Sequence, residues 1–163
     1  MAGTRVSAGI VLYRVRGGVL EVLLAHPGGP YFARKDEGHW SIPKGEPDSE
    51  PDLRVVARRE FEEETGSPIL VDDDALVPLG DIVQKGGKQV VAWAVAGDLD
   101  PATAQSNTFA LEWPPRSGRM IDVPEIDRVD WFDPAAARRV IKPTQIPLLE
   151  RLEAHLAATA TPR

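Results

Sequence analysis

The chain has 163 residues, of which 42% are hydrophobic and 27% charged, as expected of one globular domain over residues 1–163. The formal net charge of −6 argues against a nucleic-acid binder, and the absence of cysteine excludes disulfides, thiol catalysis and thiolate metal sites. No apolar run is as long as a membrane span, so we expect a cytoplasmic protein that binds neither membrane nor nucleic acid.

The first predicted elements are strands. Residues 8–15 and 19–25 are rich in Val, Ile and Leu, and they flank Arg16-Gly17-Gly18, a pattern that predicts a hairpin. A Gly/Pro-rich loop follows. A further short strand is expected at residues 40–42, where Pro43 ends it.

A helix and a second hairpin are predicted next. Residues 52–65 have a helical pattern, and Gly66 is the expected helix stop. Residues 76–84 and 89–96 flank the Gly-Gly turn at residues 85–88. Two runs joined by a short turn that contains glycine are typical of a β-hairpin.

The last part of the chain mixes a loop, a strand and helices. Residues 98–122 are polar and Pro-rich with little periodicity, which predicts a long functional or mobile loop. A strand is expected at residues 128–132, and helices at 134–140 and 146–158. Residues 159–163 are expected to fray. Mixed strands and helices predict an α/β or α+β sandwich.

Glutamates crowd the end of the predicted helix, in the stretch "ARREFEEETG" at residues 57–66. We measured their direction from Leu53, which begins the apolar stripe, at roughly 100° per residue. Glu60 and Glu64 fall within about 20° of that stripe, and Glu63 lies about 80° away. Glu62 points in the opposite direction. Three of the four glutamates therefore lie on or beside the face expected to be buried.

Buried carboxylates need a partner. Burying one unpaired carboxylate costs several kcal/mol, so a solvated run of charges accounts for Glu62 but not for Glu60 and Glu64. Residues at i, i+3 and i+4 are neighbours on a helix surface, and Mg²⁺ and Mn²⁺ prefer oxygen ligands. Glu60, Glu63 and Glu64 are thus predicted to converge on one or two divalent cations.

The stretch "GEPDSEPDLRVVARREFEEETGS", residues 45–67, resembles the Nudix box of the Nudix hydrolases. The positions that match the box are Gly45, Arg59, Glu60, Phe61, Glu63, Glu64 and Gly66, with an aromatic residue at Phe61 in place of the usual aliphatic one. Two further positions depart from it. Pro51 stands where the first box glutamate is expected, with Glu50 beside it, and Ser67 replaces the final aliphatic residue. The Pro51 change loses an outer carboxylate and leaves the metal-binding core intact.

The resemblance implies a fold and a chemistry. It implies an α/β/α sandwich with a mixed sheet, in which the box helix carries Mg²⁺ or Mn²⁺. The family cleaves a nucleoside diphosphate linked to another moiety. By resemblance Glu60, Glu63 and Glu64 are metal ligands, joined by the Gly45 carbonyl, and Arg59 holds the glutamates in place. The catalytic base is Glu60, another of these glutamates, or a carboxylate elsewhere.

Two further features are similar to the dinucleoside polyphosphate hydrolase subgroup. Lys44, in "HWSIPKGE", is a candidate phosphate-binding residue, and its alternative is a solvated loop lysine. Glu125 lies six residues before Trp131, at a spacing that resembles the catalytic base of this subgroup. The alternative for Glu125 is an ordinary surface glutamate.

Weaker candidates are cations and aromatic residues in turns and loops. Lys85, Lys88 and Arg116 are candidates for phosphate binding, and Trp113 and Tyr31 for stacking on a base. Each has a plain surface role as its alternative.

The sequence thus predicts a metal-dependent hydrolase that acts on a small nucleotide. Dinucleoside polyphosphates are the first candidate substrates, nucleoside triphosphates, including oxidised ones, the second, and nucleotide sugars the third. The rivals are a Nudix-fold nucleotide sensor without activity and an acidic helix that takes up calcium incidentally. The oligomeric state stays open.

Overall fold

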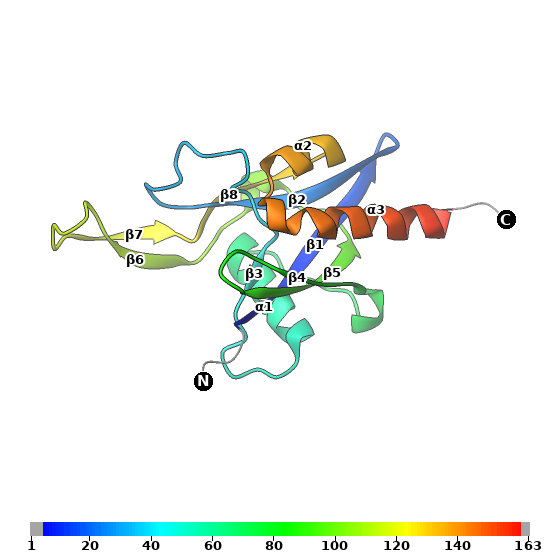
Figure 1. Cartoon of the computed structure of the whole chain (residues 1–163), viewed down its shortest axis with the longest axis horizontal. Coiled ribbons are helices and arrows are strands. Elements are labelled where there is room, and N and C mark those ends of the chain that lie inside the picture. Colours follow the sequence, from blue (N-terminus) through cyan, green and yellow to red (C-terminus); the bar gives the residue numbers. More distant parts are fainter. Residues whose placement is uncertain (1–4, 161–163) are drawn as a thin grey trace.

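A mixed β-sheet runs through the computed structural model, which describes residues 5–160 (Figure 1). The strands are β1 (Val6–Arg16), β2 (Val19–Pro27), β3 (Lys44–Gly45), β4 (Val77–Val83), β5 (Gln89–Ala96), β6 (Thr108–Glu112), β7 (Met120–Pro124) and β8 (Ile126–Phe132). The helices are α1 (Leu53–Thr65), α2 (Pro134–Val140) and α3 (Ile146–Ala160), with 3₁₀ turns at Asp73–Ala75, Pro101–Thr103 and Pro143–Gln145. The order in the six-stranded sheet is β4-β5-β1-β2-β8, and β3 pairs with β1.

Strand β1 organises the sheet. It pairs in parallel with β5, with Ile10 opposite Trp93, and antiparallel with β2, with Tyr13 opposite Val22. The tight turn between β1 and β2 uses Gly17 and Gly18 at φ 58° and 79°. A two-residue hairpin turn of this kind needs positive φ at both positions, which glycine adopts readily. The predicted first hairpin is confirmed.

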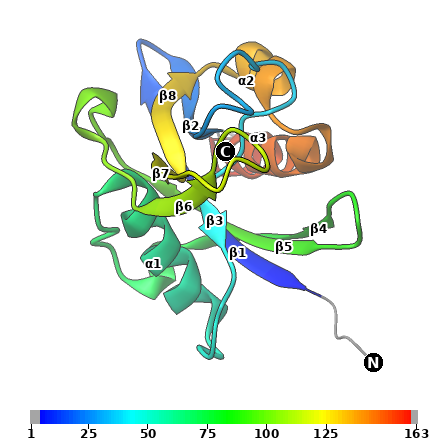
Figure 2. The same ribbon diagram turned by 90° about the vertical axis from the view of Figure 1, so that its left-hand side faces the viewer.

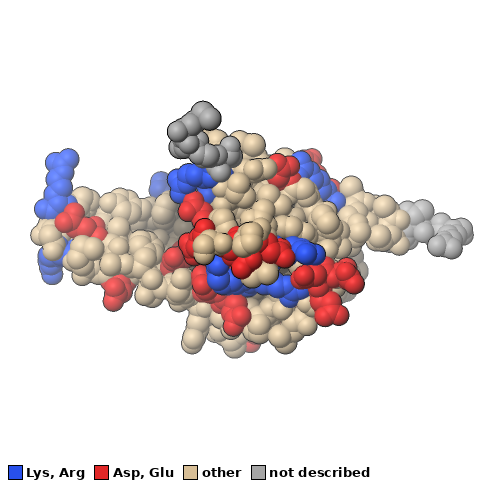
Figure 3. Space-filling view, turned by 90° about the horizontal axis from the view of Figure 1, so that it is seen from below, with Lys and Arg blue, Asp and Glu red and all other residues tan. Residues whose placement is uncertain are grey.

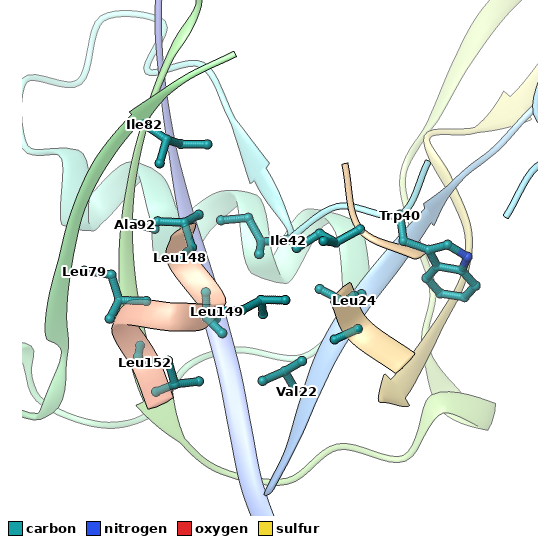
Figure 4. Close-up of a cluster of buried hydrophobic side chains, with 14 of the residues drawn as sticks. Val22, Leu24, Trp40, Ile42, Leu79, Ile82, Ala92, Leu148, Leu149 and Leu152 are labelled. Carbon is teal, nitrogen blue, oxygen red and sulfur yellow. The ribbon is translucent and has the colours of Figure 1, made fainter. Parts of the chain in front are cut away.

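The two faces of β1 bury different cores because successive side chains of a strand point to opposite sides. Ile10 and Leu12 pack in the cluster that contains Phe61 of α1. Val11 packs in the cluster that contains Leu148 of α3 (Figure 4). Figure 2 shows α1 on one side of the sheet and α2 and α3 on the other. The expected α/β/α sandwich with a mixed sheet is confirmed.

The prediction of a long loop at residues 98–122 is wrong. β6 and β7 form a separate two-stranded sheet within it, which extends away from the main sheet (Figure 1). Most of its side chains are exposed, while Val123 is buried and Leu111 and Pro124 are half-buried. Phe109 and Leu111 pair with Val123 and Ile121 on one face of the hairpin. The apolar alternation is therefore present, but it covers only two positions in each strand, which is shorter than the pattern by which a strand is recognised in a sequence.

The short strand expected at residues 40–42 lies a little later. Trp40 and Ser41 form only isolated bridges, and the two-residue strand β3 follows Pro43. The carbonyl of Pro43 accepts a hydrogen bond from the Ile10 N–H at 3.1 Å. Pairing with β1 therefore continues past the proline, which lacks only the donor.

The C-terminal helix continues further than expected. α3 runs to Ala160, and residues 161–163 of the tail predicted to fray lie outside the described residues. Across residues 5–160, none of the helices combines the length and the apolar character needed to span a bilayer.

The packing of α3 gives a stability test. Leu152 has no exposed surface, whereas Leu70 is 86% exposed. We expect Leu152→Ala to lower the free energy of unfolding by about 2–5 kcal/mol, since it leaves a cavity in the core. Leu70→Ala is the matched control and should change it by less than about 0.5 kcal/mol. Urea unfolding measures both, and equal effects would contradict the packing of α3 on the sheet.

Candidate active site

Helix α1 carries the glutamates of the candidate site, and its two ends are fixed by hydrogen-bonded caps. Asp52 caps its first turn by accepting a hydrogen bond from the Arg54 N–H at 3.0 Å. Gly66 ends it at φ 79°, where its N–H donates to the Glu62 carbonyl at 2.7 Å. A β-carbon at Gly66 would lie 3.2 Å from the Gln105 carbonyl oxygen, and a left-handed C-cap favours glycine. These caps fix which residues of α1 face the sheet.

The carboxylate of Glu64 is buried beneath this helix. Glu64 is only 5% exposed, and its Oε2 accepts a hydrogen bond from the Lys44 N–H at 3.2 Å. Burial, and then the charge of Glu60, raise the pKa of Glu64 to about 8. Within residues 5–160 Glu64 forms no salt bridge, and the charge of Lys44, which favours its ionised form, acts on it more weakly than burial and Glu60 do. Such a group is expected to take up either a proton or a cation.

Glu60 lies against the backbone of β3. A β-carbon at Gly45 would lie 2.1 Å from the Glu60 Cδ, so the carboxyl group occupies the space that any other residue would fill. This close approach accounts for glycine at position 45. The Glu60 side chain is 12% exposed, and burial, followed by the charge of Glu63, raises its pKa.

Arg59 joins the helix to the loop before it. Its Nη2 donates to the Glu46 carbonyl at 2.9 Å and to Glu60 Oε1 at 3.3 Å, and its Nε lies 3.9 Å from Glu63 Oε1. The Glu63 side chain is 42% exposed, and Glu62 is exposed, as its phase predicts. Figure 3 shows the side of the molecule where α1 lies, with acidic and basic side chains interleaved.

A pocket of about 180 Å³ opens beside the glutamates. Glu64, Lys44 and Glu125 line it, together with His39 and Lys142. The structure therefore brings the predicted base candidate, Glu125, to the same pocket as the box helix. Burial, and then the charge of Glu63, raise the pKa of Glu125.

Backbone hydrogen bonds hold Glu125 in this position. The Asn107 N–H donates to the Glu63 carbonyl at 3.0 Å, and the Glu125 N–H donates to the Asn107 carbonyl at 2.9 Å. The Glu125 carbonyl in turn accepts from the Gly28 N–H at 2.9 Å. Glu125 is thus tied to α1 through a single residue, although the two lie far apart in the sequence.

Lys44 lies in the same pocket as a partly buried cation. Burial, followed by the charges of Lys88 and Lys142, lowers its pKa to about 8. Lys142 was missed by sequence reasoning, because it lies far beyond the end of the box at Ser67. Its N–H donates to the Trp40 carbonyl at 2.8 Å, and Trp40 and Ile141 form a bridge that places the segment beside Lys44. The position of Lys142 in the site therefore follows from contacts between distant parts of the chain and not from a local sequence pattern.

The remaining candidates divide into two groups. Lys88 Nζ lies 3.8 Å from Glu46 Oε1, and Lys85 lines a second pocket. The rings of Tyr31 and Trp113 contact each other edge to face at 5.0 Å. Neither of these rings lines the glutamate pocket, nor does Arg116, which lies in the turn between β6 and β7. Tyr31 and Trp113 thus contact each other away from the glutamate pocket, and Arg116 lies in the same turn as Trp113.

The donor set suits a hard divalent cation. Carboxylate and carbonyl oxygens are the ligands that Mg²⁺ and Mn²⁺ prefer, and among the described residues the buried Glu64 carboxylate forms no salt bridge. Across the part of the chain that the structure describes, no three acidic or imidazole side chains already form a complete metal-binding group. Glu60 and Glu64 are the inward pair, and Glu63 is the more exposed third carboxylate.

Several solved structures share the fold. An Ap4A hydrolase of C. elegans in a binary complex is 22% identical with a TM-score of 0.65, over 95% of this chain and 99% of that chain. The NUDIX domain of Shewanella oneidensis NrtR, complexed with ADP ribose, is 16% identical with a TM-score of 0.66, over 96% and 90%. The E. coli ORF135 protein is 22% identical with a TM-score of 0.57, over 98% and 96%.

A comparison with curated proteins finds no match to this chain. A family model described as the NUDIX domain matches residues 3–152, which is most of the chain. The protein therefore belongs to the NUDIX family.

Proposed function

We propose that this NUDIX hydrolase cleaves a nucleoside diphosphate linked to another moiety, with dinucleoside polyphosphates as the first candidate substrates. One observation carries the proposal: the buried Glu64 carboxylate lines a pocket that also holds Lys44 and Glu125, and Glu60, which is 12% exposed, lies one turn earlier on the same helix. Hydrolysis of a phosphoanhydride needs carboxylates that bind a metal ion, a positively charged side chain that binds phosphate, and a further carboxylate that acts as the base.

Glu60, Glu63 and Glu64 are the proposed ligands of Mg²⁺ or Mn²⁺, with the Gly45 carbonyl as a further ligand. When bound, the cation neutralises charge on the phosphate oxygens and lowers the pKa of the attacking water. Arg59 keeps Glu60 and Glu63 close together, because its planar fork reaches both side chains and the Glu46 carbonyl.

Glu125 is the proposed general base. It lines the same pocket as Glu64, and its backbone is tied to α1 through Asn107, which supports a fixed position opposite the glutamates. The pKa of Glu125 is raised toward neutral pH, and a general base is most effective when its pKa lies near the working pH. Lys44 is proposed to bind a phosphate oxygen as a point charge.

The substrate class rests on weaker support. The C. elegans neighbour is an Ap4A hydrolase, and the lysines beside the pocket suit a chain of several phosphates. Nucleoside triphosphates, oxidised ones included, are the alternative. A nucleotide sensor without hydrolysis is the rival, and the presence of Glu60, Glu63 and Glu64, the metal-binding core of the box, argues against it.

A turnover panel tests the proposed function. Diadenosine tetraphosphate, nucleoside triphosphates and ADP-ribose are incubated with wild-type protein in Mg²⁺ and in EDTA, and the products are separated by chromatography. Hydrolysis in Mg²⁺ with the tetraphosphate as the best substrate supports the proposal. Binding without product formation would favour the sensor.

The buried ligand gives the first activity prediction. Glu64→Gln keeps the size of the side chain but removes a ligand charge, so kcat should fall about 10²-fold or more, on the order of 3 kcal/mol in the barrier. Glu62→Gln on the exposed side of the same helix is the matched control and should retain wild-type kcat. Steady-state kinetics in saturating Mg²⁺ measure both variants. Equal kcat values for the two would show that Glu64 is not a metal ligand.

A second prediction follows from the pKa of Glu64. Its folded-state pKa of about 8 lies above the ordinary 4.5, so the folded protein without metal binds a proton that the unfolded chain does not. The stability of the metal-free protein should therefore fall as pH rises from about 5 to about 8. Mn²⁺ competes with that proton, so its stabilisation should grow over the same range, to several degrees in Tm.

Thermal unfolding at several pH values, with and without Mn²⁺, measures this effect. Glu64→Gln should lose most of the pH dependence and most of the metal effect, whereas Glu62→Gln should keep both. A metal effect that is the same at pH 5 and pH 8 would contradict the assignment.

The base gives a third prediction. Glu125→Gln should lower kcat about 10²- to 10⁴-fold, leave KM nearly unchanged and flatten the acidic limb of the pH–rate profile. Asp122→Asn, a neighbouring exposed carboxylate on β7, is the control. If Glu60 is the base instead, Glu125→Gln will keep near-normal kcat and its acidic limb.

A further inference from the structure

A second and larger pocket, of about 840 Å³, lies next to the glutamate pocket. It is formed by Gly38–His39, by the end of β4 and the turn after it at Val83–Lys85, and by Lys142–Thr144. His39 and Lys142 line both pockets. The two hollows therefore meet at these two side chains. A volume of this size is in the range that holds a small organic ligand.

Cations are gathered where the pockets meet. In the described part of the chain neither Lys44 nor Lys142 forms a salt bridge, whereas Lys88 lies 3.8 Å from Glu46 Oε1. Burial, and next the charge of Lys88, lower the pKa of Lys142. Glu64 attracts both lysines, but more weakly than burial and the neighbouring lysines oppose their charge. Partly buried cations that repel one another and form no salt bridge favour an anion between them. A chain of phosphates meets that requirement better than a single phosphate does.

A buried amide holds the walls of the two pockets together. Gln145 has no exposed surface, and its Nε2 donates to Ser41 Oγ and to Gln84 Oε1, both at 2.9 Å. Its Oε1 accepts from the Ile42 N–H at 3.0 Å. Ser41 and Ile42 line the glutamate pocket and Gln84 lines the larger one. The buried Gln145 side chain therefore holds wall residues of one pocket at a fixed distance from a wall residue of the other.

We propose that the two pockets form one substrate channel, in which Lys142 binds the polyphosphate chain and the larger pocket receives the group at its far end. This inference rests on the proposed function and narrows it. A dinucleoside polyphosphate places phosphates along the lysines and a second nucleoside in the larger pocket. A nucleoside triphosphate leaves that pocket empty.

The first test measures binding without turnover. Inorganic tripolyphosphate is titrated by calorimetry into metal-free protein. Lys142→Gln should weaken its binding about tenfold, and Lys142→Arg should restore most of the affinity because it restores the charge. Arg139→Gln removes an exposed cation three residues earlier and should bind as the wild type does. Equal affinities for Lys142→Gln and Arg139→Gln would overturn the role of Lys142.

The second test narrows the larger pocket. Val83 is 63% exposed and lines it, so Val83→Trp adds bulk there without disturbing the core. KM for diadenosine tetraphosphate should rise fivefold or more, and KM for ATP should change less than twofold. Val15→Trp is the matched control, since Val15 is also a strand valine, 61% exposed, and lines neither pocket.

The outcomes separate this inference from the proposed function. Wild-type hydrolysis of diadenosine tetraphosphate, combined with a selective rise in KM for Val83→Trp, supports the channel. The same hydrolysis with KM unchanged in Val83→Trp overturns the channel and leaves the hydrolase in place. If the wild-type protein hydrolyses no nucleotide in Mg²⁺, the proposed function is overturned together with the channel built on it.

Discussion

Two carboxylates, one buried and one largely shielded from solvent, lie between helix α1 and the short strand β3, and the other groups of the site are arranged around them. Burial and the charge of Glu60 raise the pKa of Glu64, while burial and the charge of Glu63 raise the pKa of Glu60. Arg59 offsets part of the charge on Glu60, whereas Glu64 accepts only a backbone hydrogen bond. Gly45 yields the volume that the Glu60 carboxyl group occupies, and the Lys44 N–H donates to Glu64. A cation that binds oxygen ligands relieves the remaining repulsion.

The sheet provides the stability that such an arrangement requires. Buried like charges destabilise the folded state, so the cost must be offset by apolar burial elsewhere. β1 contributes to the cores on both faces of the sheet, and α1 is anchored in one of them by Phe61. The glutamates of α1 are thus carried by a helix that is held both by this apolar contact and by polar contacts such as those of Arg58 with the Ile69 carbonyl and Asp73. Rigid placement of this kind is what a catalytic constellation needs.

Local features of this protein were predictable from its sequence and long-range ones were not. The phase of α1 follows from 3.6-residue periodicity, so the inward direction of Glu60 and Glu64 could be read from Leu53 and Phe61 alone. The first hairpin was likewise predictable, because two glycines mark its turn. In contrast, the apolar alternation of β6 and β7 covers only two positions in each strand, which is too short to indicate a hairpin within a polar, Pro-rich stretch. The entry of Lys142 into the site depends on the bridge between Trp40 and Ile141. No local pattern encodes a contact of that kind.

The binding of Mn²⁺ to metal-free protein at pH 8 tests the central claim most directly. Calorimetric titration of the wild-type protein should reveal at least one site, and Glu60→Gln and Glu64→Gln should each weaken it tenfold or more. Glu62→Gln, on the exposed face of the same helix, should bind as the wild type does. If all three variants bind Mn²⁺ with equal affinity, the buried carboxylates are not the metal site and the account is wrong.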